Sequence, residues 1–187
     1  MINLKHCGSQ AMETKRLILR PFKIEDADDM FNNWASNDNV TKYLTWPTHT
    51  NIEITKFILS EWVKTYEDIK IYHWAIVLKQ TNEVIGDCGL TMQNIHNVIK
   101  PEIGYHIRKD MQRKGYAKEA AIAVRDWTFT NTPFKQIYSY MKYTNDPSNK
   151  TAVSWGCHFQ EEYNDEVNIK TKVYMITKEE WQNIKNK

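Results

Sequence analysis

The chain has 187 residues, of which 41% are hydrophobic, 26% charged and 12% aromatic, with only 6 glycines and 5 prolines. This composition excludes disordered, collagen-like and low-complexity proteins, and the length predicts one globular domain. Lysine and arginine total 25 and aspartate and glutamate 23, so the formal net charge is +2. So small a charge does not by itself drive binding to nucleic acid or to a membrane, and any basic function must be local.

Targeting signals are not evident in the sequence. Its longest apolar runs, residues 74–78 and 120–124, are far shorter than the ~20 residues of a transmembrane helix. Residues 1–11 lack the features of a signal peptide and are expected to form an N-terminal extension, with Met12 as an alternative start and residues 12–187 as the single domain. The three cysteines include no CxxC pair, which favours a reduced, cytoplasmic location.

The first third of the chain predicts one short strand and two helices. Residues 17–20 read as a strand that ends at Pro21. Apolar residues then recur at helical spacing over residues 27–35. Thr50 and Glu53 form a capping-box pattern before a second helix. The apolar stripe expected on that helix consists of Ile54, Phe57, Ile58, Trp62 and Tyr66.

The remaining chain alternates strands and helices. Residues 71–78 and 84–90 predict a hairpin, residues 99–107 a further strand, and residues 117–127 the most regular helix. A strand over 137–143, a short helix from Asp146 to Gly156, strands over 159–163 and 167–176 and a terminal helix capped by Thr177 follow. This order predicts an α/β fold with a mixed sheet and helices on both faces.

Residues 107–117 lead from a strand into the most regular helix and have the features of an anion-binding turn. The first amides of a helix lack internal partners and carry the positive end of its dipole. Gly115 allows a ligand to approach the backbone closely. Five cations fall within residues 108–118, namely Arg108, Lys109, Arg113, Lys114 and Lys118. Local positive charge is therefore concentrated at this helix start, although a simple turn with a solvated basic face is the alternative.

The pattern I-x-x-x-x-Q-x-x-G-x-A over residues 107–117 resembles the acetyl-CoA pyrophosphate signature of the GNAT N-acetyltransferases. Further motifs resemble the branch that contains the ribosomal-protein N-terminal acetyltransferases. They are T-x-R-L-x-L-R-P from residue 14, Y-L-x-W-x-x-H from residue 43, E-I-G-Y from residue 102 and N-x-x-S from residue 145. These motifs occur in that family's order, and the resemblance covers residues 14–181.

The resemblance implies a GNAT fold whose central, mostly antiparallel sheet splays to hold acetyl-CoA. Ile103, Tyr105 and Ile107 would form one wall beside the pantetheine arm. Asn145 would hydrogen-bond the pantetheine, and Ser148 would face the sulfur. The residues implied to hold the pyrophosphate are Gln112, Arg113, Lys114, Gly115, Tyr116 and Ala117.

Two catalytic roles are implied with their alternatives. Related enzymes often carry a tyrosine seven residues after the Asn, as general acid, but this chain has Ala152 there. Ser148 is the substitute candidate, although a serine in a first helical turn is often only a cap, and Tyr143 and Tyr105 are the other options. Glu102 is the candidate base, acting through water, with an exposed strand-end charge as the alternative reading.

Few sequence motifs indicate which residues contact the acceptor amine. Trp34, Trp46 and His49 are candidate substrate contacts, although the aromatic residues more commonly build core and His49 could be a packed loop residue. The scattered histidines have no metal-ligand spacing, so no metal is expected. Expected partners are an amine acceptor, either a protein N-terminus or a small molecule, and neither nucleic acid nor membrane; a homodimer is left open.

No G-x-S-x-G elbow or evident nucleophilic cysteine motif is present, which favours direct transfer over a covalent acyl-enzyme. The predicted function is therefore an acetyl-CoA-dependent N-acetyltransferase in which the amine attacks the thioester directly. The alternative from another class is a non-catalytic acyl-CoA-binding sensor or interaction module.

Overall fold

The computed structural model describes residues 8–42, 46–68, 72–95, 98–164 and 169–186. Its strands are β1 (Met12–Glu13), β2 (Leu17–Arg20), β3 (Tyr72–Leu78), β4 (Val84–Ile95), β5 (Val98–Ile107), β6 (Gln136–Lys142), β7 (His158–Asn164) and β8 (Lys170–Thr177). Its α-helices are α1 (Ala27–Met30), α2 (Asp38–Thr41), α3 (Ile52–Thr65), α4 (Tyr116–Asn131), α5 (Asp146–Ser154) and α6 (Lys178–Lys185). No helix in these ranges is long and apolar enough to cross a membrane.

The eight described strands form one mixed sheet in the order β1-β2-β3-β4-β5-β6-β8-β7. All neighbouring pairs are antiparallel except β5 and β6, which are parallel. A parallel pair needs a long crossover connection, and α4 supplies it here. The predicted mixed, mostly antiparallel sheet is confirmed.

The parallel pair β5–β6 separates almost at once. Its only register pair among the described residues is Glu102 opposite Tyr138, whereas β4 and β5 remain paired from Ile95 and Val98 to Gly86 and Ile107. Beyond Glu102, therefore, the β6-facing edge of β5 has no ladder partner in the described part of the chain. The predicted splay of the central strands is present, and it opens toward the start of α4.

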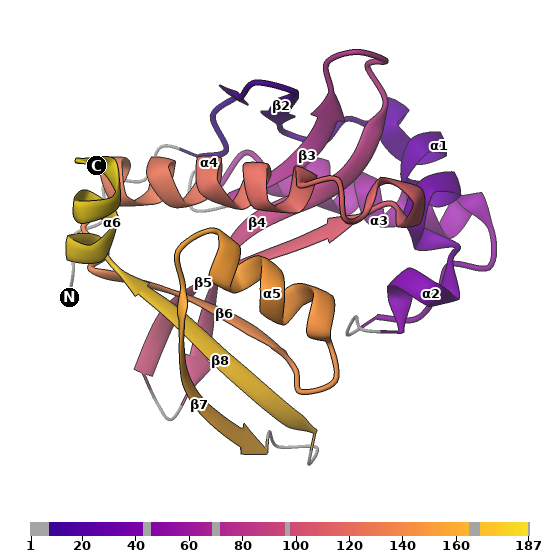
Figure 1. Ribbon diagram of the computed structural model, residues 1–187. Coiled ribbons are helices and arrows are strands. Elements are labelled where there is room, and N and C mark those ends of the chain that lie inside the picture. Colours follow the sequence, from indigo (N-terminus) through magenta and orange to yellow (C-terminus); the bar gives the residue numbers. More distant parts are fainter. Residues whose placement is uncertain (1–7, 43–45, 69–71, 96–97, 165–168, 187) are drawn as a thin grey trace.

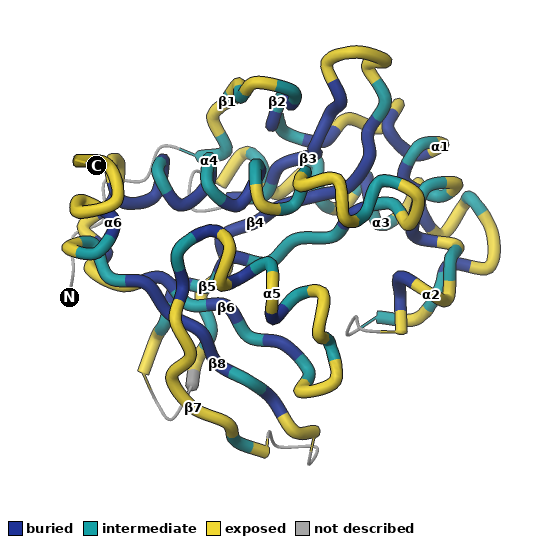
Figure 2. Tube along the Cα trace, viewed as in Figure 1, coloured by how far each residue is buried: buried dark blue, intermediate teal, exposed yellow. Residues whose placement is uncertain are grey.

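Helices cover both faces of the sheet (Figure 1). On one face α4, α5 and α6 contribute Val124, Ala152 and Trp181 to the larger hydrophobic core. On the other face α1 and α3, with the turns around them, pack Met30 and Leu59 against β3 and β4. The buried residues run along the central strands and the inner sides of these helices, while β7 is mostly exposed (Figure 2). The expected placement of helices on both faces is confirmed.

The first helical region is less regular than its spacing predicts. A 3₁₀ turn (Ile24–Asp26) precedes α1, and a π-helical segment (Phe31–Ala35) follows it. A π-turn inserts an extra residue into the helical repeat, which a 3.6-residue period does not reveal. Trp34 and Ala35 are nevertheless buried, as the spacing implies.

Two details of the second predicted helix are wrong. Its N-cap is Asn51, whose side chain accepts a hydrogen bond from the Ile54 amide, so Thr50 and Glu53 do not form the expected capping box. Phe57 is 63% exposed, whereas Leu59 is fully buried. The apolar stripe is therefore rotated relative to the predicted one, because packing against the sheet selected Thr55 and Leu59.

Several strand bounds also differ from the predictions. β4 extends to Ile95, five residues past the predicted end at Leu90, because its pairing with β5 continues to the tip of that hairpin. β6 ends at Lys142 rather than Tyr143. Residues 71 and 167, two predicted strand starts, lie outside the described residues. Near the N-terminus, Ser9 accepts from the His73 amide and the Gln10 carbonyl accepts from the Trp74 indole.

Candidate functional site

The turn before α4 exposes several backbone amides. Arg113 and Gly115 have φ angles of 62° and 83°, and Gly115 is the N-cap of α4 without a side-chain cap. Left-handed residues interspersed in a turn orient successive N–H groups toward one side, which creates an anion-binding concavity. The Gln112 side chain donates to the Ile107 carbonyl at 3.0 Å and so ties the turn to the end of β5. Residues 112–117 thus form this turn and the first positions of α4, and we call them the cradle.

The cations around the cradle divide into two groups. Arg108 is used structurally, because it donates to Asp110 at 2.7 Å and to Asn33 at 3.0 Å. Exposed cations remain close to the turn, namely Lys109, Arg113, Lys114 and Lys118. The positive charge that can reach an anion therefore comes from fewer residues than the sequence pattern suggested.

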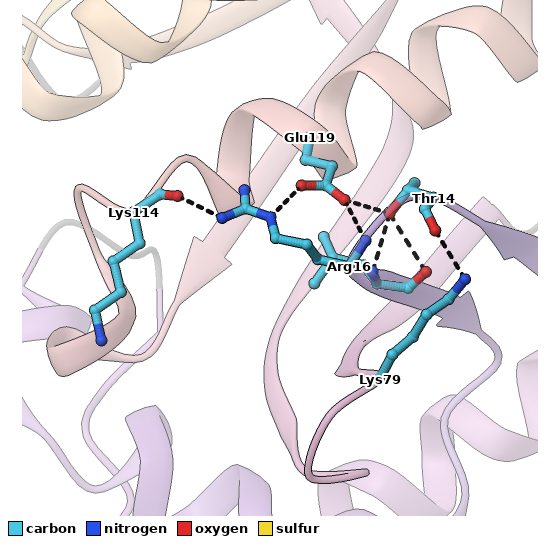
Figure 3. Close-up of polar contacts among 6 residues, drawn as sticks. Thr14, Arg16, Lys79, Lys114 and Glu119 are labelled. Atoms are coloured by element: carbon cyan, nitrogen blue, oxygen red, sulfur yellow. Dashed lines mark hydrogen bonds and ion pairs between the residues drawn. The ribbon is translucent and has the colours of Figure 1, made fainter.

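Arg16, just before β2, holds the cradle from the side (Figure 3). Its Nη1 donates to the Lys114 carbonyl at 2.9 Å, and its Nε donates to Glu119 Oε2 at 2.7 Å. Glu119 in turn accepts from the Arg16 amide at 2.8 Å and from the Thr14 hydroxyl at 2.6 Å. The guanidinium also lies 4.2 Å from the centre of the Tyr116 ring.

These contacts give the Thr14-x-Arg16 motif a structural role that its sequence alone did not assign. The motif joins the N-terminal strands to both the turn and the first turn of α4, about one hundred residues later in the chain. Only the folded register reveals this partnership. The motif acts as a brace behind the anion cradle.

The residues predicted to form one wall of the gap, Ile103, Tyr105 and Ile107, are alternate residues of β5 and share one face of that strand. Ile103 and Ile107 are buried on the α4 side, and Tyr105 lies between them. The Tyr105 hydroxyl donates to the Ser148 carbonyl at 3.2 Å and so crosses from β5 to the start of α5. Burial raises the pKa of Tyr105 far above its usual value, so this phenol remains a hydrogen-bond donor.

Asn145 and Ser148 lie together at the start of α5. Asn145 is its N-cap, and its side-chain oxygen accepts from the Ser148 amide at 3.4 Å. This bond occupies the oxygen of Asn145 but leaves its amide group for other partners. The Ser148 hydroxyl interacts with the Tyr105 phenol beside it, and the residue is half-buried. The structure thus brings Asn145, Ser148 and Tyr105 to one end of the gap.

Glu102 lies at the point where β5 and β6 separate. Its Oε2 accepts from Gln93 at 2.7 Å and from Thr91 at 3.4 Å, and its Oε1 accepts from the Tyr140 amide at 3.3 Å. Burial raises the pKa of Glu102, and these hydrogen bonds offset only part of that rise. The carboxylate is held firmly and is not the freely exposed strand-end charge of the alternative reading.

Open space lies next to Glu102. A Cβ atom added at Gly104 would meet no atom within 4 Å. Because side chains alternate along a strand, Glu102 and Gly104 belong to the same face of β5, which is the face covered by α1 and α3 elsewhere. The Glu102 carboxylate and the open space above Gly104 therefore lie on the same face of the sheet.

The three predicted acceptor contacts have different surroundings. Trp34 is fully buried in the core beneath α1 and α3, a position that favours its packing role. His49 is also buried, and its Nδ1 lies 2.8 Å from the Thr55 hydroxyl. Burial lowers the pKa of His49, so a neutral ring is favoured. Trp46 is partly exposed and packs on His49 with 4.9 Å between ring centres, while residues 43–45 lie outside the described residues.

A family model described as acetyltransferase (GNAT) domain matches residues 16–158. The uncharacterized N-acetyltransferase p20 of Bacillus licheniformis is 31% identical over 145 residues, covering 75% of this chain and 78% of that protein. The uncharacterized N-acetyltransferase YoaA of Bacillus subtilis is 30% identical over 175 residues, covering 89% of this chain and 96% of that protein.

Solved structures show the same fold. A GCN5-related N-acetyltransferase from Brucella melitensis superposes with a TM-score of 0.80 at 18% identity, covering 100% of this chain and 86% of that one. A ribosomal-protein-S5-alanine acetyltransferase from Vibrio fischeri superposes with a TM-score of 0.76 at 18% identity, covering 92% of this chain and 99% of that one. Together with the splayed sheet and the cradle, these matches establish that the chain belongs to the GNAT family of acetyltransferases.

Proposed function

We propose that this acetyltransferase moves an acetyl group from acetyl-CoA directly to a primary amine. The observation that carries the proposal is the combination of two features at the same end of the sheet: an anion cradle at residues 112–117 and a gap between β5 and β6 that ends at Glu102. A molecule with a pyrophosphate and an extended arm fits both features at once. Acetyl-CoA, when bound, supplies an activated thioester.

Donor binding is assigned to the cradle and the gap. Backbone amides of residues 112–117 would hold the pyrophosphate, with Lys109, Arg113, Lys114 and Lys118 adding long-range attraction. The open edge of β5 beyond Glu102 would pair with the pantetheine arm, with Ile107 behind it. The free amide group of Asn145 would donate to the same arm. Two groups are already used within the chain, because the Gln112 amide donates to the Lys109 carbonyl at 3.3 Å and the Ile103 carbonyl accepts from the Ser139 hydroxyl at 3.0 Å.

Two groups of the gap are assigned to the chemistry of transfer. Backbone amides of residues 103–105 would stabilise the negative oxygen that forms when the amine attacks the thioester, a contribution usually worth several kcal/mol. The Ser148 hydroxyl would donate to the departing sulfur, since it lies beside Tyr105 at the start of α5. A thiol has a pKa near ~8.5, so a hydrogen bond to its anion makes it a better leaving group.

Glu102 would face the amine. Its three hydrogen bonds occupy much of its lone-pair capacity, so attraction of the incoming ammonium group suits it at least as well as proton removal. At pH 7 only about one lysine-like amine in a few thousand is neutral, against roughly one-tenth of α-amines. Because Glu102 is a weak base, an α-amine is favoured as the acceptor. The Vibrio fischeri structure named for a ribosomal-protein alanine has the same fold.

Release of CoA thiol with defined amines tests the proposal and separates it from a non-catalytic acyl-CoA sensor. Alaninamide represents α-amines and Nα-acetyllysine amide represents lysine side chains. We expect amine-dependent thiol release, faster with alaninamide at neutral pH. Binding of acetyl-CoA without release above the buffer rate for either amine would favour the sensor.

A further inference from the structure

Three side chains on neighbouring strands form a hydrogen-bonded His–Asp–His triad that the sequence pattern did not single out. Asp87 on β4 is 6% exposed and lies between two imidazole rings. Its Oδ1 is 2.8 Å from His106 Nδ1 on β5, and its Oδ2 is 3.1 Å from His73 Nε2 on β3. The register aligns the set, because Asp87 is opposite both Ala75 and His106. Both oxygens of one buried carboxylate are therefore used by histidines.

Asp87 determines which nitrogen of His106 is available. An ionised carboxylate only accepts hydrogen bonds, so His106 Nδ1 must carry a proton and donate it. In the neutral ring this leaves Nε2 with a free lone pair. Nε2 makes no described contact within the chain, and 31% of the His106 side chain is exposed. An imidazole oriented in this way by a carboxylate is well suited to accept a proton.

His106 lies on the acceptor side of the gap. Glu102, Gly104 and His106 are alternate residues of β5 and so share one face. Gly104 lies between the other two, and it is the residue above which the structure is open. An acceptor amine that enters over Gly104 therefore meets Glu102 on one side and His106 on the other.

The surrounding charges support a basic imidazole. Burial lowers the pKa of His106, but the charge and hydrogen bond of Asp87, together with the charge of Glu102, outweigh burial and raise the pKa above 6.5. Beyond Asp87 the facing titratable groups are His73 and the Tyr66 hydroxyl, which donates to the His73 carbonyl at 2.9 Å. Burial raises the pKa of Tyr66 to about 12, so this phenol stays neutral and adds no charge.

We propose that His106, oriented by Asp87, is the group that removes the proton from the acceptor's ammonium ion. This inference rests on the proposed N-acetyltransferase function. The ammonium proton moves to His106 Nε2, and the resulting neutral amine attacks the thioester carbonyl. The new C–N bond forms, the C–S bond breaks, and the sulfur receives the electron pair. The second nitrogen proton ends on the CoA thiol, and His106 returns its proton to solvent through its exposed side.

His73 is a positioning residue in this scheme. It occupies the second oxygen of Asp87 and is itself held by the Trp62 ring, 4.5 Å away between centres. Glu102 binds the ammonium ion before the proton leaves. Glu102 thus binds the acceptor amine, whereas Asp87 orients the base His106.

The kinetic test follows kcat/KM against pH with alaninamide and with Nα-acetyllysine amide. A limb of this pH profile whose midpoint differs between the two acceptors reports ionisation of the amine. A limb whose midpoint is the same for both reports ionisation of a group on the enzyme. We expect a fixed acidic limb with its midpoint above 6.5, a midpoint lowered in Asp87→Asn, and loss of the limb in His106→Gln with a rate about 10²-fold lower near neutral pH. Glu102→Gln should mainly raise the KM for the amine.

His158→Gln is the matched control, because His158 pairs with Glu180 at 3.3 Å near α6, away from this face. It should leave the profile unchanged. Histidine NMR titration of the free protein supplies a readout independent of turnover: the resonance lost in His106→Gln should show an Nδ1-protonated neutral ring and a pKa that falls in Asp87→Asn.

The outcomes separate this inference from the proposed function. An unchanged fixed limb in His106→Gln, with amine-dependent thiol release intact, overturns the role of His106 alone. A neutral His106 ring protonated on Nε2 overturns it as well. If neither amine gives thiol release above the buffer rate, the proposed function fails first and this inference fails with it.

Discussion

Arg16 connects the carbonyl of Lys114 to the carboxylate of Glu119, at 2.9 Å and 2.7 Å respectively. The guanidinium of Arg16 therefore bridges the cradle to the first turn of α4. The backbone around Lys114 includes two left-handed residues, Arg113 and Gly115, and this conformation costs energy at a non-glycine position. The bridge offsets that cost and fixes the direction of the amides before any ligand arrives.

Arg16→Ala should therefore weaken acetyl-CoA binding. Without the bridge, the turn must be ordered at the expense of binding energy, and we expect a roughly fivefold higher Kd, since preorganisation of this kind is worth about 1 kcal/mol. Lys79→Ala is the matched control, because Lys79 contacts the Thr14 carbonyl and Glu13 but not the turn. Titration calorimetry measures both. Equal Kd values for the two variants would show that Arg16 does not organise the cradle.

Substitutions at Gly115 separate backbone conformation from charge. Gly115→Ala places a Cβ at a φ of 83°, which costs about 1–2 kcal/mol, although its nearest neighbour, the Arg16 guanidinium at 3.4 Å, would lie at ordinary contact distance. Gly115→Asp adds a negative charge to the same strain. We expect weaker acetyl-CoA binding in the first variant and none detectable in the second. Wild-type affinity in Gly115→Asp would refute the assignment of the cradle.

Ser148→Ala should lower kcat while leaving the Kd for acetyl-CoA nearly unchanged. The proposed bond from the hydroxyl forms only as the sulfur gains charge, so its removal should affect the transition state more than the bound donor. Single-turnover rates and calorimetric Kd values measure the two effects separately. A parallel loss of binding and rate would instead assign Ser148 to donor binding.

The His106–Asp87 pair predicts how stability depends on pH. Burial opposes ionisation of Asp87, yet the two histidines lower its pKa, so its contribution is present above its unfolded pKa of ~3.9 and is lost in acid. The pKa of His106 is raised, so its contribution is present below 6.5 and is lost as the pH rises through the folded value. The pair is therefore most stabilising between about pH 4 and 6.5.

Urea unfolding of Asp87→Asn tests this window. We expect a loss of about 1.5–3 kcal/mol at pH 5.5, the usual range for a hydrogen bond to a charged group, and a smaller loss at pH 8.5. Asp110→Asn, on the exposed turn after β5, is a control with an expected change of less than about 0.5 kcal/mol at both values. A loss that grows toward pH 8.5 would contradict the assigned charges.

Local signals in the sequence predicted much of the fold. The regular apolar spacing of α4, the Thr177–Glu180 capping box of α6 and the Pro147 start of α5 are all found in the structure. Each depends on residues only a few positions apart. The exposed Phe57 and the π-helical segment before α2 were not predictable in this way, because the sheet beneath them decides which side chains are buried.

In the candidate site, too, features within one segment can be read from the sequence, whereas contacts between distant segments cannot. The proposed cradle is one contiguous segment, so its pattern can be recognised in the sequence and its role stays a prediction. Arg16 with Glu119, and His73 with Asp87 and His106, depend on strand register and on contacts between distant segments. A register shift of one residue would move Asp87 to the opposite face and separate it from both rings. No spacing rule along the chain carries that information.

Direct acetyl transfer is tested most simply by following a labelled acetyl group from acetyl-CoA into alaninamide, with mass spectrometry of both the amine and the intact protein. We expect N-acetylalaninamide in equal amount to the CoA thiol released, no acetylated protein when the amine is omitted, and no product with Gly115→Asp. Thiol release without labelled amine, or an acetylated protein that forms before the product, would contradict direct transfer to an amine.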